Sequence, residues 1–137
     1  MSEAKPAPRP NADSAPYWEA CNRGELIYQA CTACGHVQFY PRALCAACQS
    51  RALEWRRSAG KGSVHTFTVN HRAPTAAFAD DAPYVIALVD MDEGFRLMLN
   101  MLNCSVEEVA IGMRVRITFE PRGPNGEQKI PQAEPDR

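Results

Sequence analysis

Apolar and polar positions change their periodicity along this 137-residue chain. Residues 1–13 are rich in proline, alanine and charge and offer almost nothing to bury, so we expect a flexible tail. Residues 14–24 favour a short helix, because Ser14 can cap it, Pro16 suits its first turn and Gly24 can end it. From residue 25 onward the pattern is that of short strands.

The strands fall into two groups on either side of Gly60 and Gly62. Residues 25–58 predict strands joined by two cysteine-bearing turns, so this region is expected to form a small ribbon. Residues 59–137 predict three strands, a short helical stretch and two more strands, which is the order of the five-stranded OB barrel. The predicted strands of this second group span residues 63–72, 84–94, 95–103, 113–123 and 127–134, with the helical stretch at 105–112. The expected fold class is therefore mainly β, with a short N-terminal helix, a ribbon and a C-terminal five-stranded OB-fold barrel.

Two barrel strands are apolar on both faces, although a small barrel has only one interior. Both sets of alternate side chains are apolar along residues 84–89, and only Asn100 interrupts the apolar run along residues 97–102. The second face is expected to meet the chain's own N-terminal segment with its helix, the cysteine-bearing ribbon, or another protein. The aromatic face of the helix leaves the same two alternatives. The candidate interface residues are Tyr17, Trp18, Val85, Ala87, Val89 and Met98.

Four of the six cysteines form two CxxC pairs in the stretch CTACGHVQFYPRALCAAC. Two such pairs, brought opposite each other by a hairpin, supply the four tetrahedral thiolates that Zn²⁺ prefers. Four protein sulfurs leave no open position for water or substrate, so the predicted site is structural. Zn²⁺ is the expected cofactor, and iron suits the same sulfurs. The predicted metal ligands are Cys31, Cys34, Cys45 and Cys48.

Charge and composition restrict the function classes. The chain has 15 basic and 16 acidic residues, whereas a protein that binds mainly nucleic acid normally carries a basic surplus. Neither a secretory signal nor a run of about 18 apolar residues is present, so we expect a cytoplasmic protein with reduced thiols. The sequence offers no paired carboxylates with a nearby base, no Ser–His–Asp candidates and no phosphate-binding loop, and we therefore predict no catalytic residues.

Together, the tryptophan-containing helix, the four-cysteine ribbon and the OB-like barrel resemble a family formerly known only as a domain of unknown function. Its members join a rubredoxin-like zinc ribbon to an acyl-CoA-associated OB fold. The resemblance covers about residues 16–120, through the stretches YWEACNRGEL, CTACGHVQFYPRALCAAC, GKGSVHTFTV, PYVIALVDMDEGFRLM and IGMRVRITFE.

The resemblance implies a non-catalytic accessory subunit that binds and stabilises a thiolase-superfamily acyl-CoA enzyme and helps form its acyl-CoA channel. The implied partner is a lipid-transfer-type aldolase, a thiolase or a condensing enzyme, and an enoyl-CoA hydratase is the alternative. An acyl-CoA that approaches this chain needs positive charge for its phosphates, and Arg42 and Arg72, beside loops, are the candidate contacts.

Two other functional classes predict different properties. A protein that binds single-stranded nucleic acid through its OB fold needs stacked aromatic side chains and a basic groove, whereas these strands carry mainly Met, Leu and Val. A redox protein of the rubredoxin type would show a visible charge-transfer spectrum, which a zinc protein lacks.

Overall fold

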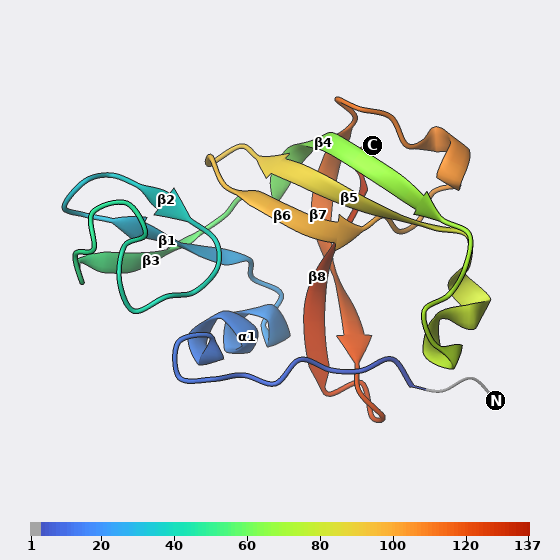
Figure 1. Cartoon of the computed structure of the whole chain (residues 1–137), viewed down its shortest axis with the longest axis horizontal. Helices are drawn as coiled ribbons and strands as arrows, with labels where there is room; N and C mark the ends of the chain where they lie inside the picture. The colour runs from blue at the N-terminus through green and yellow to red at the C-terminus, as the bar shows by residue number, and fades with distance from the viewer. Residues whose placement is uncertain (1–3) are drawn as a thin grey trace.

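The computed structural model describes residues 4–137 and is mainly β (Figure 1). A small ribbon and a larger barrel lie side by side, and the one α-helix of the described residues packs beneath them (Figure 1). The elements are α1 (Ala15–Asn22), β1 (Ile27–Cys31), β2 (Val37–Gln38), β3 (Leu53–Arg57), β4 (Lys61–Asn70), η1 (Ala76–Asp81), β5 (Tyr84–Met91), β6 (Arg96–Asn100), η2 (Val106–Glu108), β7 (Arg114–Arg122) and β8 (Gln128–Pro135).

Helix α1 begins and ends close to the predicted positions. Ser14 occupies the N-cap position, and Gly24 follows the last turn with a φ of 78°, a conformation that glycine adopts without steric cost. The Ser14 hydroxyl accepts a hydrogen bond from the Asn11 N–H at 3.0 Å, and the Ser14 N–H donates to Asn11 Oδ1 at 2.9 Å. The side chain of Ser14 therefore fixes the turn before the helix instead of capping the helix itself.

The ribbon is a three-stranded antiparallel sheet in the order β2-β1-β3. The central strand β1 pairs with β2 through Ala30 and Val37 and with β3 through Gln29 and Trp55. Both cysteine-bearing turns lie at one end of this sheet, away from the barrel (Figure 1). The predicted ribbon is thus confirmed in its strands.

The second sheet has the order β6-β5-β4-β7-β8, which is the OB topology that the sequence predicts. Its two edge strands meet only at one end, where Met101 forms a parallel bridge with Ala133. There the side chain of Gln132 accepts a hydrogen bond from the Asn100 N–H at 2.8 Å. The sheet is therefore OB-like without being closed along its whole edge. The helical stretch expected at residues 105–112 is shorter than predicted, because the backbone is extended again at Val109.

Strand β5 resolves the question of its two apolar faces. Val85, Ala87 and Val89 have exposed fractions of 2%, 0% and 0% and lie in the barrel interior. The intervening side chains are half-buried on the other face. The interface prediction for these three residues is therefore wrong, because their side chains belong to the protein's own core.

One hydrophobic core runs through the helix, the ribbon and the barrel. Residues of α1 and β1 belong to the same buried cluster as the barrel interior. Phe95, directly before β6, stacks on Tyr28 of β1 with the ring centroids 4.7 Å apart. Its ring also stacks on Phe39, at 5.7 Å, and Phe39 meets Tyr17 of α1 edge to face at 5.2 Å. Aromatic contacts therefore join all three parts of the molecule.

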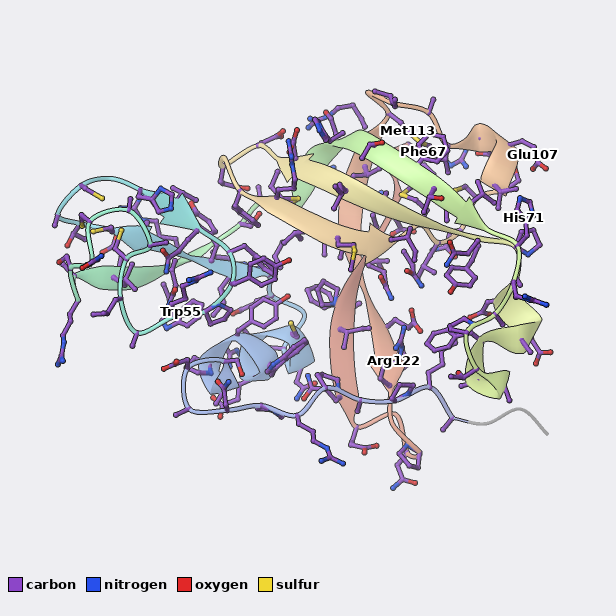
Figure 2. The ribbon with its side chains drawn as sticks, viewed as in Figure 1. Trp55, Phe67, His71, Glu107, Met113 and Arg122 are labelled. Carbon is purple, nitrogen blue, oxygen red and sulfur yellow. The ribbon has the colours of Figure 1, made fainter. Side chains whose placement is uncertain are left out.

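The described part of the expected flexible tail lies against the barrel, and residues 1–3 fall outside the described residues. Lys5 forms ion pairs with Asp81 and Glu120, and its carbonyl accepts a hydrogen bond from the Gly123 N–H at 3.2 Å. The Pro6 carbonyl accepts a hydrogen bond from Arg122, at the lower end of the β7–β8 hairpin in Figure 2. The segment therefore has specific contacts that its composition does not reveal.

Replacing Phe95 with alanine tests the shared core. The ring is 5% exposed and contacts two ribbon side chains, so F95A should lower the free energy of unfolding by about 3–5 kcal/mol. Urea unfolding followed by circular dichroism measures this change. Met98→Ala, at a side chain that is 65% exposed, is the control and should stay within about 0.5 kcal/mol of the native chain. Equal effects of the two substitutions would contradict the shared core.

Candidate functional site: a cysteine centre and an adjoining apolar groove

The four predicted ligands meet at the far end of the ribbon. All four Sγ atoms lie within 4.8 Å of one another. The Sγ atoms of Cys31 and Cys48 are 3.6 Å apart, as are those of Cys34 and Cys45. A tetrahedral ion with metal–sulfur bonds of about 2.3 Å places its sulfurs about 3.8 Å apart, so the cluster fits such an ion. The structure confirms that these cysteines are positioned for metal binding.

Backbone groups of each turn favour thiolates at the first cysteine of each pair. The Cys48 N–H lowers the pKa of Cys45 to about 6, and the Cys34 N–H lowers the pKa of Cys31. The backbone N–H of His36 acts in the same direction on Cys34, yet the pKa of Cys34 rises to about 12 because the neighbouring Cys48 sulfur opposes a further negative charge. Four thiolates this close together therefore need a cation, as a metal centre requires.

Two buried glutamines hold the loop before the second CxxC pair. Gln29 Oε1 accepts hydrogen bonds from Gln38 Nε2 at 2.8 Å and from the Arg42 N–H at 3.0 Å. Gln29 Nε2 donates to the Arg42 carbonyl, and Gln38 Oε1 accepts from the Ala46 N–H. These bonds position Cys45, whose N–H itself donates to the Ser50 carbonyl. The sequence contains no signal for this network, because the alternating pattern of a strand does not show which groups its polar side chains will bond.

An apolar groove of ≈ 540 Å³ lies where the N-terminal segment, α1, the ribbon and the diverging strands β6 and β8 meet. In Figure 1, α1 and the ribbon lie beside β6 and β8, the strands that carry many of the lining residues. Aliphatic and aromatic side chains make most of its walls. The lining residues are Pro6, Ala7, Pro8, Ser14, Tyr17, Trp18, Phe39, Tyr40, Pro41, Ile86, Leu97, Met98, Leu99, Asn100, Arg122, Ile130, Pro131 and Gln132.

Three of the predicted interface residues line this groove, but they differ in exposure. Tyr17 is only 3% exposed and packs in the core. The prediction that its side chain forms an interface is therefore wrong, except for the small part that lines the groove. Burial also raises its pKa. Trp18 is half-buried, and Met98 is 65% exposed. Tyr40, which sequence reasoning missed, is 64% exposed on the ribbon wall of the groove. Exposed apolar side chains therefore stand on both of its walls.

The two predicted phosphate contacts are not brought together. Arg42 lies in the ribbon loop that follows Pro41, a groove residue, whereas Arg72 follows β4 at the opposite end of the molecule (Figure 1). Both side chains are exposed. Of the two, only Arg42 adjoins the groove.

The two cysteines outside the metal cluster are poorly placed for nucleophilic chemistry. Cys21 is 0% exposed, and burial raises its pKa to about 11. Burial also raises the pKa of Cys104, which is half-exposed. Among residues 4–137, no helix is long and apolar enough to cross a membrane.

Comparison with known proteins identifies both modules. Residues 18–54 match the model of the "ChsH2, rubredoxin-like zinc ribbon domain", and residues 55–120 match that of the "ChsH2, C-terminal OB-fold domain". A "DUF35 domain-containing scaffold protein" of Methanocaldococcus jannaschii is 40% identical over 95 residues, which cover 69% of this chain and 67% of that protein. This chain belongs to the DUF35 family. The resemblance predicted from the sequence is thus confirmed, as are the zinc ribbon and the OB fold.

Other relatives differ in length. A "Probable enoyl-CoA hydratase alpha subunit" of Thermomonospora curvata is 36% identical over 111 residues, which cover 81% of this chain but only 34% of that protein. The chain therefore spans about a third of that relative. Among solved structures, a chain of the "Ltp2-ChsH2(DUF35) aldolase" superimposes with a TM-score of 0.84 and 33% identity, covering 96% of this chain and 100% of that one. These similarities support an accessory role beside an enzyme.

Replacing a metal ligand tests the cysteine centre. Cys45→Ser removes one of four sulfurs, so the purified protein should lose its single bound metal ion and the thiolate-to-cobalt absorption of its Co²⁺-substituted form. Metal analysis and visible absorption measure the two effects. Cys104→Ser, outside the cluster, should leave both unchanged. A full complement of tightly bound metal in the Cys45→Ser protein would refute the four-cysteine site.

Proposed function

We propose that this chain is a non-catalytic accessory subunit that binds and stabilises a thiolase-superfamily acyl-CoA enzyme of the lipid-transfer aldolase type. The observation that carries the proposal is the apolar groove, with Tyr40 and Met98 exposed on its two walls. The structural similarity to a chain of the Ltp2-ChsH2(DUF35) aldolase supports this class of partner. The metal ion holds the ribbon in shape and takes no part in the reaction; we propose that it is Zn²⁺.

The groove suits a protein surface for physical reasons. Apolar side chains that stay in water contribute no hydrophobic stabilisation, and a contiguous exposed set of them often marks an interface. Met98 adds a flexible thioether side chain that can adapt to the shape of a partner. Trp18 and Tyr40 supply large aromatic surfaces beside it, the residue types that contribute most to interface energies.

The acyl-CoA is held by the complex, and this subunit helps form the channel that receives it. Arg42 is the favoured contact for a CoA phosphate, because it is exposed and follows a groove residue. Arg72, which follows β4 and lies outside the groove lining, is the weaker proposal. Neither arginine forms an ion pair among the described residues, so both guanidinium groups are available to an anion.

An enoyl-CoA hydratase is the second candidate partner. It is favoured by the relative named as a hydratase alpha subunit, which matches over most of this chain. A nucleic-acid partner is less well supported, because the net charge is −1 and aliphatic side chains predominate on the barrel walls of the groove.

Co-purification tests the proposed partner class. Co-expressed with acyl-CoA enzymes of the thiolase and hydratase classes from the same genome, the tagged chain should retain a thiolase-fold protein. Met98→Glu should abolish this retention, because a partner that covers the groove would bury an unpaired charge. Gel filtration and mass spectrometry of the retained protein measure the outcome.

The control for this experiment is Ile111→Glu. Ile111 is 70% exposed and lies on a turn outside the groove, so the same charge there should leave retention intact. Retention of a hydratase in place of a thiolase-fold protein would favour the second candidate. Retention of neither protein by the native chain would contradict the proposal.

A further inference from the structure

The walls of the groove come from two modules. Tyr40 and Pro41 belong to the ribbon, whereas Met98 and Leu99 belong to barrel strand β6. The chain crosses from ribbon to barrel between the end of β3 and the start of β4, through residues 58–60. The angle between the modules at this linker therefore sets the distance between the two walls.

The side chain of Glu93 binds this linker from the β5–β6 turn. Its Oε1 accepts a hydrogen bond from the Ser58 hydroxyl at 2.8 Å, and its Oε2 accepts one from the Ala59 N–H at 2.7 Å. One carboxylate thus bonds two consecutive linker residues, and hydrogen bonds to a charged acceptor are stronger than neutral ones. The partners of Glu93 are a hydroxyl and a backbone N–H, neither of which is charged. The Glu93 carboxylate therefore holds the linker backbone in place and does not form an ion pair with these groups.

Ser58 is itself a fixed point of the linker. It is 7% exposed, and its N–H donates to the Leu26 carbonyl at 2.8 Å, which ties it to the residue before β1. Its hydroxyl oxygen also accepts a hydrogen bond from the Gly60 N–H at 3.0 Å. Through Ser58, Glu93 therefore connects the β5–β6 turn to Leu26, directly before the ribbon strand β1, and to Gly60, at the barrel end of the linker.

The same turn reaches the ribbon at a second place. Phe95, two residues after Glu93, stacks between Tyr28 and Phe39. Phe39 directly precedes Tyr40 and Pro41 and itself lines the groove. The turn thus contacts the ribbon at the linker through a carboxylate and at the groove wall through a ring. Because these two contacts lie at separate places, they restrain the rotation of the ribbon relative to the barrel as well as the distance between them.

We propose that Glu93 is a positioning residue that fixes the orientation of the ribbon relative to the barrel and so keeps the groove in the shape its partner binds. The role as a determinant of partner binding rests on the proposed function, whereas the effect on orientation does not. Without the Glu93 carboxylate, residues 58–60 regain backbone freedom that partner binding must remove again. Partner affinity should therefore fall by about tenfold, because binding must order the linker again.

Residual dipolar couplings of the ¹⁵N-labelled, metal-loaded chain test the orientation directly. In the native protein, the couplings of ribbon and barrel should fit one alignment tensor. In Glu93→Ala they should require two tensors, and in Glu93→Gln, which keeps one acceptor oxygen, the departure should be smaller. Metal content should stay at the native value in both variants, because the cysteine cluster lies at the other end of the ribbon.

The matched control is Glu54→Ala, on strand β3 of the ribbon. Glu54 pairs with Arg56 at an exposed position and does not contact the linker. Its loss should leave a single tensor and native partner affinity. A single, native tensor in Glu93→Ala would overturn the positioning role, whatever the partner does.

Binding of the retained enzyme to the same variants separates this inference from the proposed function. A tenfold weaker complex of Glu93→Ala, with the Glu54→Ala complex unchanged, supports both. Two tensors in Glu93→Ala together with native affinity would overturn the link between Glu93 and partner binding. If the native chain retains no enzyme but Glu93→Ala still needs two tensors, the positioning role stands and the proposed function fails.

Discussion

Stacked aromatic rings at the junction of ribbon and barrel are the contact on which the rest of this structure depends. The ribbon is a three-stranded sheet with few apolar side chains, too small to bury a core of its own. Phe95 of the barrel supplies the missing apolar surface by stacking on Tyr28 and Phe39. Tyr17 then brings α1 against the same rings. Helix, ribbon and barrel therefore share one core.

The cysteine centre and the aromatic junction stabilise opposite ends of the ribbon. At one end, four sulfurs converge on a metal-sized centre. At the other, the aromatic junction sets the ribbon against the barrel, and Gln29 and Gln38 order the loop between the two ends. One consequence is functional. Because the ribbon is held beside diverging strands, an apolar groove is left open where the three parts meet.

The parts of the structure that sequence could predict are those set by local spacing. The CxxC pairs predict the metal ligands because two residues between cysteines fit one tight turn. The OB topology follows from the order of three strands, a short helical stretch and two strands, each bounded by turn residues. The helix limits follow from Ser14 and Gly24, residues with strong positional preferences.

The parts that sequence could not predict depend on contacts between distant residues. Strand β5 is apolar on both faces, so alternation could not show that Val85, Ala87 and Val89 point inward. No local pattern encodes how ribbon and barrel meet. The exposure of Tyr40 depends on this arrangement, and so do the hydrogen bonds of Glu93 to the linker. The composition of residues 1–13 predicts a flexible tail and cannot show the ion pairs of Lys5, whose partners Asp81 and Glu120 are distant in the sequence.

The central claim is that ribbon and barrel share one core, and it is tested most directly by unfolding the Co²⁺-substituted protein with two probes. Cobalt–thiolate absorption reports the ribbon, and far-ultraviolet circular dichroism reports mainly the barrel strands. A shared core predicts one transition, with the same urea midpoint for both probes. Two separate midpoints, with the barrel signal unchanged while the cobalt signal is lost, would contradict it.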